Sequence, residues 1–396
     1  MKIGQFTDTF LPVVDGVGRV VSSYAHAMGQ LCDACYVITP QQADLYRGDL
    51  PYEIVDFNGM PLPMSPQYRA GMPILDVHYR RRITNVKLDI VHMHSPFITG
   101  REAYRISRDQ DIPLVGTFHS KYYDDFYQIT KSHTLSKIGN RYVIDSLEKC
   151  DQVWAVSNST AEVLRGYGYK GTIEVVENGT DRKVPDIQAA QLVEKRFNLD
   201  QRPLLLYVGQ INWKKNIRRI LEVVDALHRQ RRNMRLIMAG QGPSEAEVHA
   251  LSASLGLNDM VIYTGHVTDT NLLDGLYTRA DLLVFPSLYD NAPMVVREAA
   301  ALGTPSLLAR GSCAAEVVHD GQNGLLANDT TADMAERIAW ALDNPTKLKE
   351  IGMAAQATIP KPWEDVITEV LERYEDLIRT TQRFRHCKTS HQIPPQ

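Results

Sequence analysis

The segment from Phe285 to Glu298 holds two acidic residues eight positions apart, with a proline between them. Because proline suits the first turn of a helix, Pro293 predicts a helix start, with Asp290 just before the helix and Glu298 inside it. The N–H groups at a helix N-terminus attract anions, and carboxylates accept hydrogen bonds from sugar hydroxyls. An ordinary helix with a solvated glutamate is the alternative. However, Glu298 precedes an Ala-Ala-Ala-Leu-Gly run, which predicts partial burial and a partner for its charge.

A second segment, Tyr207–Asn216, ends an apolar run at Gly209 and places Lys214 and Lys215 just before a helix-like pattern. Glycine lets a backbone approach a phosphate closely, and lysine at a helix N-terminus neutralises the phosphate charge. The alternative is that these lysines are only solvated side chains, which would account for one of them more readily than for both. We therefore predict a phosphate site here.

Two more motifs follow apolar runs in the first half of the chain. Gly16 and Gly18 follow the first run and open a helix, but the third glycine of the dinucleotide fingerprint is missing, so a classical NAD site is not expected. His119 ends another run, with Ser120 and Lys121 beside it, which predicts a polar cluster at the carboxyl end of a strand. A plain strand-to-helix turn and a structural histidine are the respective alternatives.

Other residues of metal-binding type form no complete site. The alternation of His92 and His94 places both on one face of a strand, without a third ligand at metal spacing. Cys32 and Cys35 form a single C-x-x-C, which we interpret as small buried residues at a helix-to-strand junction. An odd total of five cysteines argues against a disulfide framework.

Strand-like and helix-like segments alternate along the chain, which predicts an α/β fold with parallel sheets covered by helices on both faces. The strand segments are continuous apolar runs, as parallel strands buried on both faces require. The first series comprises Lys2–Phe6, Cys35–Thr39, Glu53–Phe57, Asp89–His94, Leu114–His119 and Gln152–Val156. The second comprises Leu204–Gly209, Arg235–Gly240, Val261–Thr264, Leu282–Pro286 and Ser306–Ala309.

A chain of 396 residues exceeds the usual size of one hydrophobic core, so two domains are expected. We place the first over residues 1–184 and the second over 200–362, with a polar linker between them. The last predicted helix, which begins at Trp363, has one apolar stripe and must pack on another element. Residues 386–396 have no periodicity and are expected to be a frayed tail.

The net charge of −4 provides no basic footprint for nucleic acid, so nucleic-acid binding is not expected. No apolar run has the length of a membrane span or of a signal-peptide core, so we expect a cytoplasmic protein. Arg80–Arg82 with Lys87, and the segment 121–127, could contact an anionic membrane from its inner face. A solvated charged face is the simpler interpretation.

Taken in order, six motifs give the chain a nearly full-length resemblance to the retaining glycosyltransferases of family 4, which have the two-domain GT-B fold. The motifs are the Pro12–Gly16 turn, Val175–Asp181, Gly209–Lys215, Ala239–Pro243, Asp290–Glu298 and Asp320–Leu326. The resemblance implies two Rossmann-like domains that face a cleft, with the last helix, about 363–385, crossing back onto the first domain. It also implies a nucleotide-diphosphate sugar bound mainly by the second domain and an acceptor bound mainly by the first.

The resemblance implies three catalytic residues: His119 near the transferring sugar, Lys215 on the diphosphate and Asp290 on sugar hydroxyls. Glu298 would accept the ribose hydroxyls. The donor site would comprise Gly16, Gly209, Gln210, Lys214, Lys215, Asn291, Ala292, Pro293, Met294, Val295 and Glu298. The only D-x-D, Asp109–Asp111, falls at a helix-to-strand junction and outside the donor loop, so neither a metal nor another cofactor is expected.

The chain departs from the family pattern at the donor site. Gln210 stands where an arginine usually follows the glycine, and Ala292-Pro293 replaces Phe-Gly. The expected function is retaining hexosyl transfer, with UDP-glucose as the first choice of donor and a lipid, glycan or small-molecule hydroxyl as the acceptor. Three alternatives stay open: a GT-B nucleotide-sugar epimerase, a sugar phosphorylase, and a non-catalytic nucleotide-sugar-binding subunit.

Overall fold

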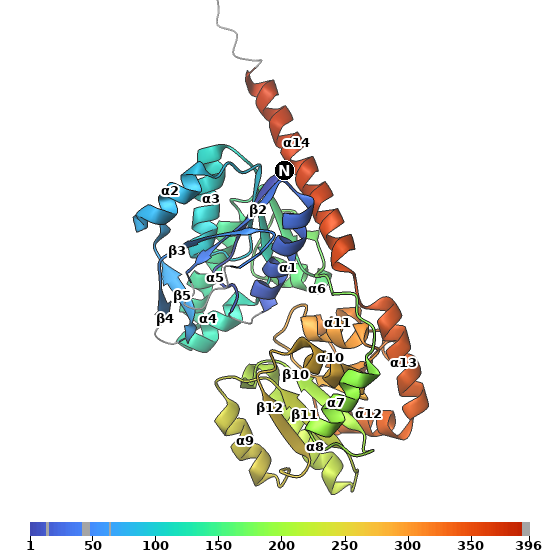
Figure 1. The fold of residues 1–396 in the computed structure, drawn as a ribbon. Helices are drawn as coiled ribbons and strands as arrows, with labels where there is room; N and C mark the ends of the chain where they lie inside the picture. The colour runs from blue at the N-terminus through green and yellow to red at the C-terminus, as the bar shows by residue number, and fades with distance from the viewer. Residues whose placement is uncertain (13–15, 42–47, 63–64, 390–396) are drawn as a thin grey trace, which may run out of the picture. The chain divides into compact units, whose positions relative to one another are not determined.

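The computed structural model describes residues 1–12, 16–41, 48–62 and 65–389 (Figure 1). The chain forms two compact units, Met1–Gly179 with Trp363–Gln396, and Thr180–Pro362. Each unit contains a parallel sheet with helices packed around it, which confirms the predicted fold class.

The first unit is built on seven parallel strands in the order β3-β2-β1-β6-β7-β8-β9. The strands are β1 (Lys2–Phe6), β2 (Ala34–Pro40), β3 (Glu53–Phe57), β6 (Ile90–Met93), β7 (Leu114–Phe118), β8 (Gln152–Ala155) and β9 (Glu174–Val175). Its helices are α1 (Gly16–Leu31), α2 (Val77–Asn85), α3 (Ile98–Gln110), α4 (Tyr122–Thr130), α5 (His133–Leu147), α6 (Asn158–Gly166) and α14 (Trp363–Thr389). Every residue of β6 and β7 is buried, as their apolar character predicts.

An antiparallel hairpin, β4 (Gly59–Leu62) with β5 (Ser65–Gly71), interrupts the strand–helix alternation of the first unit. Its sequence is rich in proline and has no continuous apolar run, so the strand pattern used above did not detect it. A short 3-10 turn, η1 (Pro73–Leu75), then leads into α2.

The second unit contains six parallel strands in the order β12-β11-β10-β13-β14-β15. They are β10 (Leu204–Val208), β11 (Arg235–Ala239), β12 (Val261–Gly265), β13 (Leu282–Phe285), β14 (Ser306–Ala309) and β15 (Leu325–Ala327). The helices are α7 (Ile187–Arg196), α8 (Ile217–Arg229), α9 (Glu245–Ser254), α10 (Thr270–Arg279), α11 (Met294–Ala301), α12 (Thr331–Asp343) and α13 (Pro345–Thr358). The short strand β15 was not predicted.

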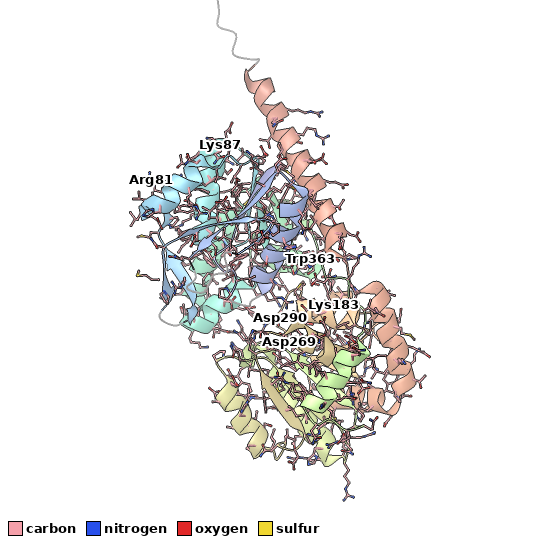
Figure 2. All side chains as sticks on the ribbon, viewed as in Figure 1. Arg81, Lys87, Lys183, Asp269, Asp290 and Trp363 are labelled. Carbon is pink, nitrogen blue, oxygen red and sulfur yellow. The ribbon has the colours of Figure 1, made fainter. Side chains whose placement is uncertain are left out.

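The predicted linker is not a separate segment in the structure. Helix α7 packs so closely on α10 that a Cβ on Gly275 would lie 2.5 Å from the carbonyl oxygen of Ala189. Lys183, labelled in Figure 2, also forms an ion pair of 2.5 Å with Asp274 of α10. Residues 180–199 therefore belong to the second unit, whereas the sequence analysis divided them between the first domain and the linker.

Helix α14 belongs to the first unit. Its Tyr374 is fully buried, stacks on Trp154 with ring centroids 5.6 Å apart, and lies within 3.4 Å of the side-chain amide of Gln5. The helix continues to Thr389, so residues 386–389 are helical and not part of a frayed tail, and residues 390–396 lie outside the described part of the chain. No helix in the described residues combines the length and the apolar character of a membrane span.

Candidate active site

In the second unit, two glycines bring the loops after β10 and β11 into contact. Gly209 donates a hydrogen bond of 3.0 Å to the carbonyl of Ala239, and a Cβ on Gly240 would lie only 1.9 Å from the carbonyl oxygen of Gly209. The carbonyl of the exposed Gln210 is held by the Tyr207 hydroxyl at 2.9 Å. This crossing fixes the path of the backbone at the carboxyl end of β10, where open parallel sheets bind ligands.

The two predicted lysines lie on a 3-10 turn, η2 (Trp213–Lys215), between β10 and α8. Asn212 caps the turn through its side chain, and Asn216 closes it in the left-handed conformation with φ of 62°. The Nζ atoms of Lys214 and Lys215 lie 4.2 and 5.3 Å from the centroid of the Tyr289 ring. The turn and the aromatic ring thus hold two half-buried cations next to each other.

Asp290, labelled in Figure 2, lies on the loop that follows β13 and forms an ion pair with Lys215. The Ser287 hydroxyl accepts hydrogen bonds from the backbone N–H groups of Tyr289 and Asp290, both at 3.3 Å, and so orients this loop. Only one carboxylate oxygen of Asp290 is used, because Oδ2 is buried and has no hydrogen-bond partner among the described residues. A buried oxygen of this kind can accept a hydrogen bond from a ligand hydroxyl.

The predicted helix after Asp290 is present as α11. It begins at Met294. Pro293 is the N-cap residue and stands just before the first turn, whereas the sequence analysis placed it inside that turn. Glu298 is buried at 4% exposure, as its apolar neighbours predicted, and accepts a hydrogen bond of 2.9 Å from the Tyr277 hydroxyl. The structure thus brings Lys215 and Asp290 into direct contact, while Glu298 has a separate partner on α10.

The predicted donor residues between Asp290 and Glu298 form one continuous stretch of loop and helix start. Asn291 is buried, and Ala292, Pro293, Met294 and Val295 are half-buried. The first-turn N–H groups of α11 belong to this stretch, as in any helix start. The backbone amides of this stretch can bind an anion, and Lys214 and Lys215 of the same unit supply positive charge to neutralise it.

In the first unit, His119 follows β7 directly and contacts His94, which follows β6. Their facing nitrogens, His119 Nε2 and His94 Nδ1, are 3.1 Å apart, and His94 Nε2 lies 2.6 Å from Gln5 Oε1. An amide oxygen only accepts, so His94 carries its proton on Nε2 and accepts at Nδ1. His119 therefore donates through Nε2–H and keeps its lone pair on Nδ1.

The two alternating histidines do lie on one face, with the ring centroids of His92 and His94 4.0 Å apart. Burial lowers the pKa of His119 to about 4 and holds the pKa values of His92 and His94 well below the ordinary value, so all three rings are neutral at pH 7. His92 bridges the hydroxyls of Tyr374 and Thr117 at 2.5 and 2.7 Å. A buried polar network thus links His119, through Gln5, to the last helix.

Asp8 is a candidate residue that the sequence analysis missed. It follows β1, its Oδ1 accepts a hydrogen bond of 3.0 Å from Thr99 N–H at the start of α3, and its buried Oδ2 has no partner among the described residues. Burial raises the pKa of this carboxyl to about 6. The available signal was an acidic residue two positions after the first apolar run, at the edge where ligands bind.

Gly16 begins α1, and a Cβ built on it would meet nothing within 4 Å. Contacts among the described residues therefore do not require glycine at this position. Residues 13–15, which complete the predicted Pro12–Gly16 turn, lie outside the described residues.

The D-x-D and C-x-x-C motifs lie in ordinary structural environments. Asp109 lies in the last turn of α3 and pairs with Arg105 at 2.6 Å. At the α1-to-β2 junction, Cys35 is buried and Cys32 is partly exposed. No group of three or more His, Cys, Asp or Glu side chains suitable for a metal occurs within the described residues.

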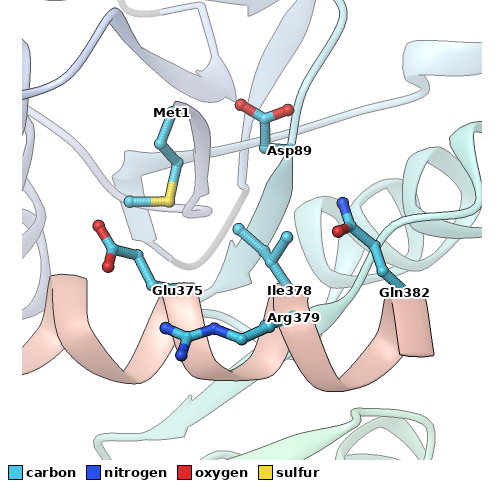
Figure 3. A pocket seen from close by; sticks show the side chains of 6 residues that line it. All are labelled: Met1, Asp89, Glu375, Ile378, Arg379 and Gln382. Atoms are coloured by element: carbon cyan, nitrogen blue, oxygen red, sulfur yellow. The ribbon is translucent and has the colours of Figure 1, made fainter. Parts of the chain in front are cut away.

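A cavity of about 370 Å³ lies elsewhere in the first unit (Figure 3). Met1 and Asp89 line it from the start of β1 and the residue before β6, and four side chains of α14 complete it. It therefore lies at the amino ends of these strands, whereas Asp8, His94 and His119 lie at the carboxyl ends. This position separates the cavity from the candidate site.

Two family models match the chain, "Glycosyltransferase Family 4" over residues 14–184 and "Glycosyl transferases group 1" over residues 190–358. The chain belongs to glycosyltransferase family 4. It is a glycosyltransferase, with one family model on each sheet-containing part of the chain.

Similar proteins of this family act on different sugars. The chain is 26% identical to an α-monoglucosyldiacylglycerol synthase of Streptococcus pneumoniae, over 79% of this chain and 71% of that one. It is 24% identical to a GDP-mannose-dependent α-mannosyltransferase of Corynebacterium glutamicum, over 97% and 91%. Among solved structures, the Anabaena protein HepE in complex with UDP and glucose has a TM-score of 0.78 at 16% identity, over 95% and 100%. This structural similarity supports the GT-B fold.

Proposed function

We propose that the protein is a retaining hexosyltransferase that transfers glucose from UDP-glucose to a hydroxyl group of a lipid acceptor. The observation that carries the proposal is the Lys215–Asp290 pair at the carboxyl edge of the second sheet. The pair joins a cation, which we assign to the diphosphate, to a carboxylate with one unused buried oxygen, which we assign to a sugar hydroxyl. The names of two similar proteins support glucose and a diacylglycerol-type acceptor, namely the pneumococcal synthase and UDP-glucose-bound HepE.

In this proposal, the second unit binds the donor. Lys215, Lys214 and the first-turn amides of α11 stabilise the diphosphate, whose negative charge increases as the bond to the sugar breaks. Glu298 accepts hydrogen bonds from the ribose hydroxyls. Lys214 compensates for Gln210, which replaces the arginine of the family pattern. No metal is assigned to the reaction.

The residues proposed for the first unit are neutral. His119 forms a hydrogen bond with a hydroxyl of the transferring sugar, and its tautomer is fixed by His94 and Gln5. The departing phosphate then takes the proton of the acceptor hydroxyl, so the new bond forms on the face that the phosphate leaves. The proposal thus needs no protein nucleophile.

The first experiment is thermal stabilisation by UDP, GDP and ADP and by their glucose or mannose conjugates. A ligand at 100 times its dissociation constant adds about 2.7 kcal/mol to the free energy of unfolding. We expect UDP and UDP-glucose to raise the thermal midpoint most. In a second experiment, we expect transfer of glucose from UDP-glucose to diacylglycerol, with an α-linked product identified by NMR. A β-linked product would exclude the retaining mechanism. Selective stabilisation by GDP would show that the donor is a GDP-linked sugar and not UDP-glucose.

The same assay separates the other candidate activities. Conversion of UDP-glucose into another UDP-sugar without an acceptor would indicate an epimerase, and phosphate-dependent cleavage of a disaccharide would indicate a phosphorylase. Donor binding without transfer or donor hydrolysis would indicate a binding subunit.

A further inference from the structure

Four apolar side chains are exposed within six residues of the first unit. Met72, Ile74, Leu75 and Val77 have exposed fractions of 58%, 62%, 70% and 59%. They lie on and beside η1 and at the start of α2. Single exposed apolar residues are ordinary, but a cluster of them marks a contact surface.

This segment is held from the inside by hydrogen bonds. Asp76 accepts from the backbone N–H groups of Tyr79 and Asn58 at 3.0 and 2.8 Å, and so caps α2 and ties it to the loop after β3. The buried Tyr79 donates to Glu102 at 2.8 Å, which anchors α2 on α3. The four apolar side chains are therefore presented to solvent on a fixed frame.

Cations surround the apolar cluster. Residues 57–88 contain five lysine and arginine residues, of which Arg82 pairs with Glu53 and Asp56. The single acidic residue in this range is Asp76, whose carboxylate is used in the cap. Arg80, Arg81 and Lys87 are exposed, and Figure 2 shows Arg81 and Lys87 on and just after α2 at the outer side of the unit. An anionic lipid surface attracts such cations and admits aliphatic side chains between its headgroups.

The α4–α5 pair has the same chemistry. Ile129, Leu135 and Ile138 are more than half exposed and have Lys131 and Lys137 near them in the sequence, whereas Arg141 pairs with Asp145 and Glu148. In Figure 1, α2, β5 and α4 follow one side of the first unit. The second unit offers no comparable run in the described residues, because its exposed large apolar residues are isolated or stand beside acidic residues.

We propose that the surface formed by Met72, Ile74, Leu75 and Val77 together with Arg80 and Arg81 docks the protein on the headgroup region of an anionic lipid bilayer. The aliphatic side chains enter between the headgroups while the arginines bind their phosphates. Docking does not depend on the donor site of the second unit, and it brings the first unit to the surface from which a lipid acceptor would be taken.

The experiment is cosedimentation of the purified full-length protein with large vesicles. We expect binding to vesicles that contain phosphatidylglycerol, much weaker binding to pure phosphatidylcholine vesicles, and weakening by salt. The variant Arg80→Glu/Arg81→Glu and the variant Ile74→Ser/Leu75→Ser should each weaken binding about tenfold or more. Lys349→Glu and Met353→Ser, which change exposed residues of α13 in the second unit, serve as matched controls and should bind as the unmodified protein does.

Unchanged vesicle binding by both surface variants, or no binding of the unmodified protein to anionic vesicles, would overturn the proposal. So would self-association in sedimentation velocity that Ile74→Ser/Leu75→Ser abolishes while vesicles are not bound, because the surface would then be a protein interface. Thermal midpoints and stabilisation by UDP, measured without vesicles, report on folding and on the donor site. A failure of docking is thereby distinguished from a failure of the proposed transferase activity.

Discussion

The two units carry different ionisable groups at the same edge of their sheets. At the carboxyl edge of the first sheet, His92, His94 and His119 are held neutral by burial. At the carboxyl edge of the second, Lys215 and Asp290 form an ion pair between half-buried loops. One architecture thus supports two kinds of site, and the loops after the strands determine which: a lysine–carboxylate ion pair where a diphosphate is proposed to bind, and neutral imidazoles where a sugar hydroxyl is proposed to bind.

The units also differ in how their site residues are supported. Gln5 and Tyr374 connect the histidines to the core and to the last helix, so substitutions there act on folding as well as on the site. Lys215 stands on a short turn held mainly by its own backbone and by Asn212, so its removal should leave the fold intact. The comparison therefore predicts separable effects in the second unit and coupled effects in the first.

The largest effect is expected for Lys215→Ala. Loss of the cation should lower kcat for transfer about 10²–10³-fold, the range for removing one group that stabilises transition-state charge. The thermal midpoint should fall by a few degrees at most, because the Lys215 side chain lies on a surface turn, although its removal leaves the carboxylate of Asp290, only 17% exposed, without its partner. Lys214→Ala is the matched control and should lower kcat less than Lys215→Ala does. Transfer within a few-fold of the unmodified rate would show that other residues stabilise the diphosphate charge, and the contrast between the units would fail.

A smaller effect is expected at Glu298, and two substitutions separate its roles. Glu298→Gln keeps an acceptor for the Tyr277 hydroxyl but removes the charge, so UDP affinity should fall about tenfold, as expected for a charged hydrogen bond, with little change in stability. Tyr277→Phe removes the donor and leaves the carboxylate, so UDP affinity should be largely kept. Calorimetric titration with UDP measures both. Equal UDP affinity in Glu298→Gln and the unmodified protein would remove Glu298 from the ribose site.

The first unit is tested through the residue that fixes the tautomer of its histidines. Gln5→Met fills the same space but cannot accept from His94, so His94 and His119 can exchange their proton positions. We expect kcat to fall about tenfold, the cost of one lost positioning hydrogen bond, with donor KM nearly unchanged. Nitrogen NMR of the imidazoles reports the tautomer directly.

The matched control for Gln5→Met is Thr117→Val, which removes a partner of His92 and leaves the Gln5–His94–His119 chain intact. It should keep the tautomer of His119 and most of the activity. An unchanged tautomer population in Gln5→Met would show that the His119 proton is placed by something other than this chain.

The sequence predicted the sheets well because parallel strands buried on both faces must be continuous apolar runs, as β10 and β13 are. It also predicted the burial of Glu298 from its neighbours. It could not predict β4–β5, whose pairing depends on position in the unit more than on apolar pattern, or the packing of α7 on α10, which depends on the small residues Ala189 and Gly275.

Within the site, the Asp290–Glu298 helix was predictable because proline and spacing fix a helix start. The partners Tyr277, Tyr289 and Gln5 were not, since each comes from a different element and reaches the site only through tertiary packing. Asp8 was missed for the same reason: its carboxylate acts on the start of α3, which is distant in sequence. Side-chain chemistry at strand ends is thus predictable by position, but its pairing is not.

The smallest effect is expected for Asp8→Asn, and it tests whether the first site excludes charge. The folded-state pKa of about 6 lies above the ordinary value of 3.8, so between these values the folded state binds more protons and stability falls as pH rises. Above about pH 6 the buried charge has its full cost. Asparagine can still accept from Thr99 N–H, so Asp8→Asn should raise the free energy of unfolding by about 1–2 kcal/mol at pH ~7.5 and by much less at pH ~4.

Thermal melts of Asp8→Asn and the unmodified protein at both pH values measure this difference, because the titration of the three histidines is common to the two proteins and cancels in the comparison. At about 2–4 °C per kcal/mol for a unit of this size, the expected shift is a few degrees at the higher pH. A shift that is equal at both pH values would show that the Asp8 carboxyl is not destabilised by its charge. In that case the first unit would tolerate an anion at its carboxyl edge, and the neutral character that distinguishes it from the second unit would be confined to its histidines.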